Sequence, residues 1–147
     1  MPLISGTRLR IRSPFYLPQF LWGNEMSARQ LARAPGFLGG GLLVDRGRAF
    51  WTVTAWEDEA AMRTYRNTGA HRGVMPKLLK WCDEATVVHW GQEGAALPDW
   101  AELYRRMISE GKVSKVSCPS ARHAARQFPE PRAGRLSRVI RPRLKTD

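Results

Sequence analysis

The sequence predicts an α+β fold in which a ferredoxin-like βαββαβ unit carries an extra C-terminal helix and a basic arm. Three observations favour this class. Patterns typical of strand, helix, strand, strand, helix and strand follow one another over residues 6–91. The length of 147 residues suits one domain plus an extension, and 43% hydrophobic residues suit a packed core. We therefore expect a domain over residues 1–96 and an extension over residues 97–147.

The unit opens with a strand over residues 7–13, and a helix follows between Pro18 and Pro35. Leu9 and Ile11 alternate with arginines, which is typical of a strand with one apolar face. Proline is tolerated in the first turn of a helix, as at Pro18, and a Pro-Gly pair such as that at Pro35 ends one.

A hairpin and an interrupted second helix come next. Residues 37–56 have the pattern of two strands that turn at residues 45–47. Three acidic residues at 57–59 favour a helix N-terminus, and Asn-Thr-Gly at 67–69 breaks the helical pattern. Pro76 cannot sit deep in an unbroken helix, because its ring clashes with the preceding turn. We therefore expect two short helical pieces and not one long helix.

A last strand over residues 85–91 completes the unit. Two helices cover only one face of a four-stranded sheet, so the other face is expected to meet a second layer or water. A further helix begins at a capping-box-like pair, Asp99 and Glu102, and closes at Gly111. Residues 112–147 contain four prolines, many arginines and little periodicity, which predicts a disordered segment or an arm lying on a partner.

Positive charge is concentrated in this arm. The net charge is +11; residues 1–90 contribute 12 − 7 = +5, and residues 112–147 contribute 10 − 2 = +8. Such an excess favours an anionic partner, which can be nucleic acid, a membrane surface or an acidic small molecule. One hypothesis is therefore a non-enzymatic basic dimer that binds nucleic acid or another polyanion.

Other patterns indicate a soluble cytoplasmic protein. Cys82 and Cys118 are too few for a disulfide framework and lack metal-ligand spacing, so no metal site is expected. Three arginines stand where a signal peptide needs an apolar segment. No apolar run approaches the ~20 residues that span a bilayer, and no P-loop is present.

The octamer RGRAFWTV, residues 46–53, matches part of the signature of RNA-recognition motifs. The first strand of such a domain supplies an aromatic platform for bases, whereas here it supplies arginines. The pattern favours an ordinary aromatic hairpin over an RNA-binding surface.

A longer segment resembles a known family. Residues 50–90 contain a strand that ends in Trp56 before an acidic turn, then a helix, then a Thr-Gly-Ala-His step that ends at His71. The stretch FLGGGLL at residues 37–43 has the form of the family's second strand. In these features the chain is similar, over residues 6–91, to the antibiotic-biosynthesis-monooxygenase superfamily, with its DUF3291 and spheroidene-monooxygenase-like branches as the nearest in pattern.

The resemblance implies a homodimer, in which the open sheet faces of two copies close into a dimeric α+β barrel. Some members oxidise aromatic polyketides without a cofactor, some degrade haem through an Asn, a Trp and a His, and others bind haem through a histidine. Here Asn24 lies in the first helix and Tyr65 stands near the tryptophan position, so the haem-degrading triad is not reproduced. We expect a monooxygenase-like enzyme or a ligand-binding protein for an apolar or aromatic substrate. It either needs no cofactor or binds haem through His71.

His71 is the centre of the predicted site. A histidine on the buried side of an interrupted helix can be a general base, a proton shuttle or a haem ligand. The alternative is a core histidine bonded to a backbone carbonyl. His89 is expected to face solvent or the barrel, and His123 to be uninvolved. The predicted catalytic residues are His71 and Tyr65, and the predicted substrate-binding residues are Trp22, Asn24, Trp56 and Arg12.

Arg8, Arg10 and Arg12 form a row along the first strand. In one interpretation they lie along the sheet surface or pair with acids. In the other, one or two of them line the pocket and clamp a carboxylate or a haem propionate. The sequence leaves both interpretations open.

Overall fold

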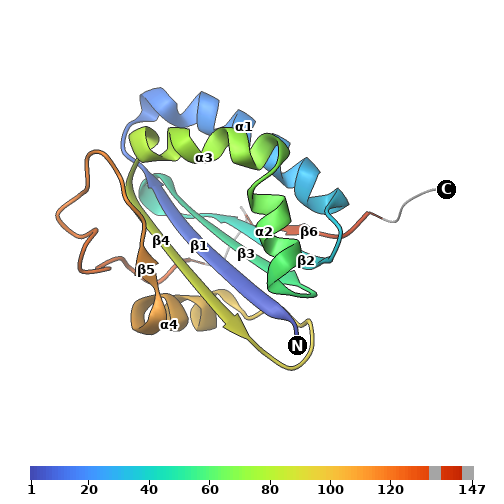
Figure 1. Cartoon of the computed structure of the whole chain (residues 1–147). Coiled ribbons are helices and arrows are strands. Elements are labelled where there is room, and N and C mark those ends of the chain that lie inside the picture. The colour runs from blue at the N-terminus through green and yellow to red at the C-terminus, as the bar shows by residue number, and fades with distance from the viewer. Residues whose placement is uncertain (133–136, 144–147) are drawn as a thin grey trace.

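The computed structural model describes residues 1–132 and 137–143, and its elements follow the predicted order (Figure 1). The inner strands are β1 (Leu3–Ile11), β2 (Phe37–Val44), β3 (Ala49–Trp56) and β4 (Cys82–Gly91). The helices are α1 (Leu17–Arg33), α2 (Glu59–Arg66), α3 (Gly69–Trp81) and α4 (Trp100–Glu110), with 3-10 turns at Pro14–Tyr16 and Arg46–Arg48. Two short strands, β5 (Lys112–Val113) and β6 (Ser137–Ile140), lie in the extension.

The strands form one sheet in the order β5-β4-β1-β3-β2-β6. Every neighbouring pair is antiparallel, and β1 lies between β4 and β3 in the middle. The inner four strands, joined by two helical crossovers, make the split βαβ arrangement. The predicted ferredoxin-like α+β fold is therefore confirmed.

α1, α2 and α3 cover one face of this sheet, and the local sequence sets their ends. α2 begins after Asp58, whose side chain accepts a hydrogen bond from the Ala61 amide at 2.8 Å. Asn67 and Thr68 separate α2 from α3, and Gly69, with φ of 60°, begins α3, so the predicted interruption is confirmed. α3 nevertheless continues through Pro76, so the expectation that this proline cannot sit in an unbroken helix is wrong. Pro76 and Arg72, the residue whose carbonyl the proline leaves unbonded, are both exposed.

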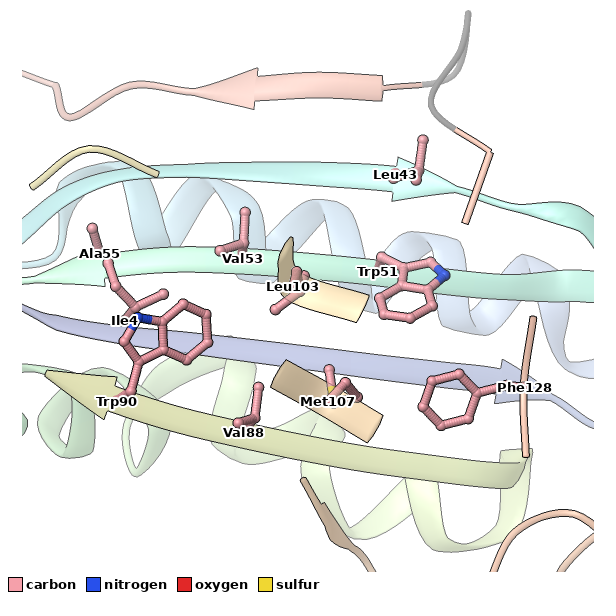
Figure 2. Packing of buried hydrophobic residues seen from close by; sticks show 10 residues of the cluster. All are labelled: Ile4, Leu43, Trp51, Val53, Ala55, Val88, Trp90, Leu103, Met107 and Phe128. Atoms are coloured by element: carbon pink, nitrogen blue, oxygen red, sulfur yellow. The ribbon is translucent and has the colours of Figure 1, made fainter. Parts of the chain in front are cut away.

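The opposite face is covered by α4 of the same chain (Figure 2). Leu103 and Met107 of α4 are completely buried, each 0% exposed. The second layer expected on this face is therefore α4, in the place where the family resemblance implies a second copy. The apolar cluster that α4 joins contains Ile4, Leu43, Trp51, Val53, Ala55, Val88, Trp90 and Phe128.

The described part of the extension packs on the chain's own sheet. β5 pairs with β4 and β6 pairs with β2, so a strand is added at each edge. Phe128 joins the cluster under α4, and Ile140 is buried against α1 and α2. His123 is also buried, and its Nδ1 accepts a hydrogen bond from the Ala85 amide at 3.3 Å. The expectation of a disordered or partner-bound arm is wrong for these residues, because they find their partners within the chain.

Candidate functional site

Hydroxyl side chains stand in two rows across the middle of the helix-covered face. Thr52 of β3 pairs with Thr7 of β1, and Thr54 pairs with Ser5, whose other neighbour is His89 of β4. Paired positions in an antiparallel sheet point to the same face, so these side chains lie side by side. Ser5, Thr7, Thr52 and Thr54 are named the hydroxyl rows below.

The hydroxyl rows separate two apolar clusters beneath the helices. One cluster lies at the start of α1 and the end of α3 and includes Phe20, Phe50 and Trp81. The other lies at the end of α1 and under α2 and includes Leu31, Trp56 and Met62. Ser5, Thr7 and Thr52 are only partly buried although they belong to inner strands. Solvent therefore reaches this face of the sheet between the two clusters.

Three of the predicted site residues meet beside the hydroxyl rows. The rings of Trp56 and Tyr65 have centroids 5.3 Å apart, and those of Tyr65 and His71 are 4.8 Å apart. Trp56 Nε1 donates a hydrogen bond to Thr54 Oγ1 at 2.9 Å, which links the aromatic stack to the rows. The structure thus brings His71, Tyr65 and Trp56 together.

The hydrogen bonding of His71 fixes its tautomer. Nδ1 lies 3.1 Å from the carbonyl oxygen of Arg66. A carbonyl only accepts, so Nδ1 carries the proton and donates it, and Nε2 keeps a lone pair. No described residue bonds Nε2. Burial lowers the pKa of His71 below its ordinary 6.5, and the Arg66 charge acts in the same direction while the bond to its carbonyl opposes both. The ring is a neutral base.

Tyr65 holds this ring in place. Its hydroxyl donates a hydrogen bond to the backbone oxygen of Ser27 at 3.0 Å, and burial raises its pKa above the ordinary value of 10.0. The raised pKa keeps this hydroxyl protonated at neutral pH, and its proton is engaged with the Ser27 oxygen, so Tyr65 is not available as a base. The geometry therefore supports a positioning role for Tyr65, as the surface on which His71 stacks.

Gln30 of α1 fastens the α2–α3 junction that carries His71. Its Nε2 donates to the carbonyls of Tyr65 and Thr68, at 3.2 and 2.9 Å, and its Oε1 accepts from the His71 amide at 3.0 Å. A Cβ atom at Gly69 would lie only 3.1 Å from the Gln30 amide group. The glycine therefore supplies both the left-handed turn and the room for Gln30.

His89 is a further candidate on the same face. It neighbours Ser5 and remains in contact with solvent. Partial burial lowers its pKa, Arg66 lowers it further, and Glu59 raises it. The charge of Arg66 lowers the pKa of both His71 and His89. Side chains alternate along a strand, so His89 and Trp90 point to opposite faces of the sheet. The sequence does not say which face is which; the pairing of His89 with Ser5 shows that His89 lies on the face covered by α1, α2 and α3.

The other predicted binding residues lie elsewhere. Trp22 is 69% exposed and lines an open groove of about 990 Å³ between α1 and α3. Asn24 lines a separate cavity of about 190 Å³ between α1 and the β2–β3 hairpin. Arg12 donates to the Lys80 carbonyl at 2.7 Å, at the opposite end of α3 from His71. Neither of these two cavities includes His71.

Arg8 and Arg10 lie on the α4 side of the sheet, where they pair with acids. Arg8 Nη1 is 3.2 Å from Glu84 Oε2, and both side chains are buried. Arg10 contacts Asp83. Burial lowers the pKa of Arg8, and the Glu84 charge raises it. Because the sheet separates these arginines from His71, the interpretation in which they pair with acids is the correct one for both.

Within residues 1–132 and 137–143, no three His, Cys, Asp or Glu side chains gather as metal ligands. Among the helices of these same residues, none is long and apolar enough to cross a membrane. Cys82 is buried, Cys118 is exposed, and both are free thiols.

Sequence comparison finds one family. Residues 25–77 match the model of the antibiotic biosynthesis monooxygenase family. This segment runs from α1 through the hairpin into α3, and it contains His71, Tyr65 and Trp56. A search of curated proteins finds no match.

Solved structures extend the comparison. SnoaB, a cofactor-independent oxygenase from Streptomyces nogalater, is 17% identical with a TM-score of 0.53, over 63% of this chain and 94% of that chain. A protein from Mycobacterium tuberculosis is 11% identical with a TM-score of 0.58, over 65% and 99%. A crystal structure described as an antibiotic biosynthesis monooxygenase is 20% identical with a TM-score of 0.56, over 63% and 99%. The chain therefore has the fold of these proteins, and its residues 25–77 resemble the antibiotic biosynthesis monooxygenase family.

Proposed function

We propose that this protein is a small-molecule enzyme of the monooxygenase type, in which His71 is the general base. The observation that carries the proposal is a neutral imidazole whose Nδ1 is bonded to the Arg66 carbonyl while Nε2 has no described partner. A general base must be unprotonated at the working pH and within reach of the substrate proton. The lowered pKa of His71 meets the first condition. The fold shared with a cofactor-independent oxygenase supports the reaction class.

The surroundings of His71 suit an aromatic substrate that carries hydroxyl groups. Tyr65, which is partly exposed, supplies an aromatic ring beside His71, and the buried Trp56 packs against Tyr65 from within the core. Ser5 and Thr7 offer hydroxyls that both donate and accept hydrogen bonds. Removal of a proton from a ring hydroxyl or an activated C–H by Nε2 leaves an electron-rich anion, the form of the substrate that reacts with molecular oxygen.

Two substitutions of His71 separate the base from the structural bond. In His71→Asn the amide nitrogen stands near the position of Nδ1 and keeps the bond to the Arg66 carbonyl. In His71→Gln the amide stands near Nε2 and that bond is lost. Neither amide takes up a proton, so both variants should lose turnover by roughly 100-fold or more. The measurement is oxygen consumption with hydroxylated naphthalene and anthracene probes.

The matched control is Trp22→Ala, in the groove between α1 and α3. It should leave turnover unchanged if chemistry occurs at His71. Full turnover per folded molecule in His71→Asn would contradict the proposal. A loss of turnover in Trp22→Ala with no loss in the His71 variants would contradict it as well. His71→Asn should also keep the melting temperature closer to that of the parent than His71→Gln does.

Haem binding through His71 is a second hypothesis, and two of the arginines predicted to hold the haem propionates lie on the other face of the sheet. A haem needs cationic partners for its propionates, and Arg8 and Arg10 lie on the far face of the sheet with Glu84 and Asp83. The two cavities described above do not reach the His71 ring. An absorption spectrum of the protein with added haem should therefore show no band of histidine-ligated haem.

A polyanion is the remaining candidate ligand. The observation that favours it is the charge of +8 on residues 112–147, from 10 basic and 2 acidic residues. Clustered arginines and lysines bind phosphate backbones through counterion release. This binding is independent of the His71 site, and its salt dependence is the test described in the Discussion.

A further inference from the structure

We infer that α4 and the following segment as far as Phe128 take the place of a second copy of this chain. The sheet face opposite the helices is closed within one chain, so the protein is a monomer in solution. The same face becomes a surface for a second copy only when α4 leaves it.

The first support is the close fit between α4 and the central strand. A Cβ atom at Gly6 of β1 would collide with Leu103 Cδ1 and would lie 3.2 Å from Val88 Cγ1. Leu103 therefore occupies the room that the glycine leaves. Trp100 also packs over Gly41 of β2, where a built Cβ would lie 3.5 Å from its ring, an ordinary van der Waals distance. The sheet surface is shaped to receive this helix.

The second support is the nature of the surface under α4. Trp51, Val53, Val88 and Trp90 come from two strands and form one cluster with Ile4 (Figure 2). Each is at most 7% exposed while α4 is docked. Without α4 they would form a contiguous apolar patch of the kind that monomeric soluble proteins do not leave open. Either α4 or another molecule must cover it.

The third support is the treatment of charge on this face. The Arg8 guanidinium lies 4.5 Å from the centre of the Phe128 ring and 5.7 Å from that of Trp51. Arg8 is also bonded to the buried Glu84. Phe128 thus covers the buried Arg8–Glu84 ion pair and places its ring against the Arg8 guanidinium. An aliphatic surface of a partner would bury the same charges without this contact. The extension fits the face in charge as well as in shape.

Hydrogen bonds within the chain hold the segment that connects β4 to α4. The Gln92 amide donates to the Pro2 carbonyl at 3.1 Å, and its side chain donates to the Ala96 carbonyl at 2.7 Å. Trp90 Nε1 donates to Gln92 Oε1 at 3.2 Å. These bonds turn the chain back toward its own sheet, which favours docking of α4 within one chain over exchange of helices between two chains.

Sedimentation of the full chain tests the inference. The parent protein should sediment as a monomer of 16.7 kDa at micromolar concentration. Gly6→Val fills the room that Leu103 occupies, so it should displace α4 and shift the mass, with rising concentration, toward twice that value. In the double variant Gly6→Val/Leu103→Ala, the three carbon atoms added at position 6 are offset by the three removed at position 103. α4 should therefore dock again, and this variant should be monomeric.

The matched control is Ile108→Val on the exposed side of α4, which should remain monomeric. A parent protein that sediments as a dimer would overturn the inference. So would a folded Gly6→Val variant that stays monomeric while hydrogen exchange shows α4 released. The rescue by Leu103→Ala distinguishes a displaced helix from a strand that merely fails to fold.

Discussion

The two ring nitrogens of His71 serve different purposes. Nδ1 ties the start of α3 to the end of α2 through the Arg66 carbonyl, and Nε2 stays available. A proton taken up from a substrate would arrive at Nε2 and leave the Nδ1 bond intact. The core and catalytic interpretations of this histidine are therefore compatible, since each concerns a different atom.

The lowered pKa of His71 makes the stability of the protein depend on pH. The unfolded histidine titrates near 6.5 and the folded one below that value, so at intermediate pH the unfolded chain binds more protons. The free energy of unfolding should be constant above that window and fall as pH decreases through 6.5 toward the folded pKa. Urea unfolding at a series of pH values should show a smaller decrease for His71→Asn.

His89 has a lowered pKa as well, and its contribution has the same sign. His89→Gln is therefore the comparison that divides the pH dependence between the two histidines. An acid-side decrease that is identical in the parent and in His71→Asn would contradict the burial of His71.

At the scale of elements, the junction between α2 and α3 depends on one side chain from α1. Gln30→Met keeps the size of the side chain but removes its bonds to Tyr65, Thr68 and His71. The loss should lower the free energy of unfolding by about 1–2 kcal/mol. It should also lower turnover, because His71 loses its fixed position. Gln30→Glu keeps the acceptor for the His71 amide and should lose less turnover, and equal loss in both would count against this role.

The extension is a second element whose contribution can be measured. Phe128 is buried between Arg8 and the aromatic rings of Trp51 and Tyr104. Phe128→Ala should lower the free energy of unfolding by roughly 3 kcal/mol, as large-to-small core substitutions do. Phe128→Leu, which keeps most of the volume, should cost less. A chain cut after Gly111 should be clearly less stable, and an unchanged denaturation midpoint would show that the extension is dispensable.

These elements show what periodicity predicts and what it omits. The helix break at residues 67–69 and the order of the helices and inner strands along the chain follow from local residue types, which is why both are predictable. The edge strands β5 and β6 are not, because their segment has little periodicity. The docking of α4 is not, because an apolar stripe at Leu103 and Met107 does not specify which surface it covers. The hydroxyl rows join Ser5 to Thr54 across β1 and β3, and such a register forms only in three dimensions. Trp22 is predicted to join the site as an aromatic residue of α1, yet its position on the helix turns it to solvent.

At the scale of the whole molecule, the net charge of +11 should make binding to DNA strongly dependent on salt. Arg132, Arg141 and Arg143 of the extension are exposed. Changing all three to Gln should reduce the slope of log K against log salt by up to ~0.9 for each DNA phosphate that these arginines neutralise in the parent protein. Fluorescence anisotropy with a short duplex measures this slope.

The control for this experiment is a triple change of exposed arginines outside the extension, Arg33, Arg63 and Arg105, to Gln. It lowers the net charge equally. Equal slopes in both triple variants would show that binding follows total charge and not the extension.

The two faces of the sheet differ in a way that bears on motion. Beneath α4 the apolar side chains form one cluster, whereas beneath the other helices they form two, with the hydroxyl rows between them. The sheet and α4 therefore make a rigid base, and the opposite layer has a built-in seam. Small movements of the helices apart along that seam would admit a guest molecule next to His71, while the apolar cluster beneath α4 stays packed. Amide hydrogens of α2 should accordingly exchange with solvent faster than those of α4, and a bound guest should slow the former alone.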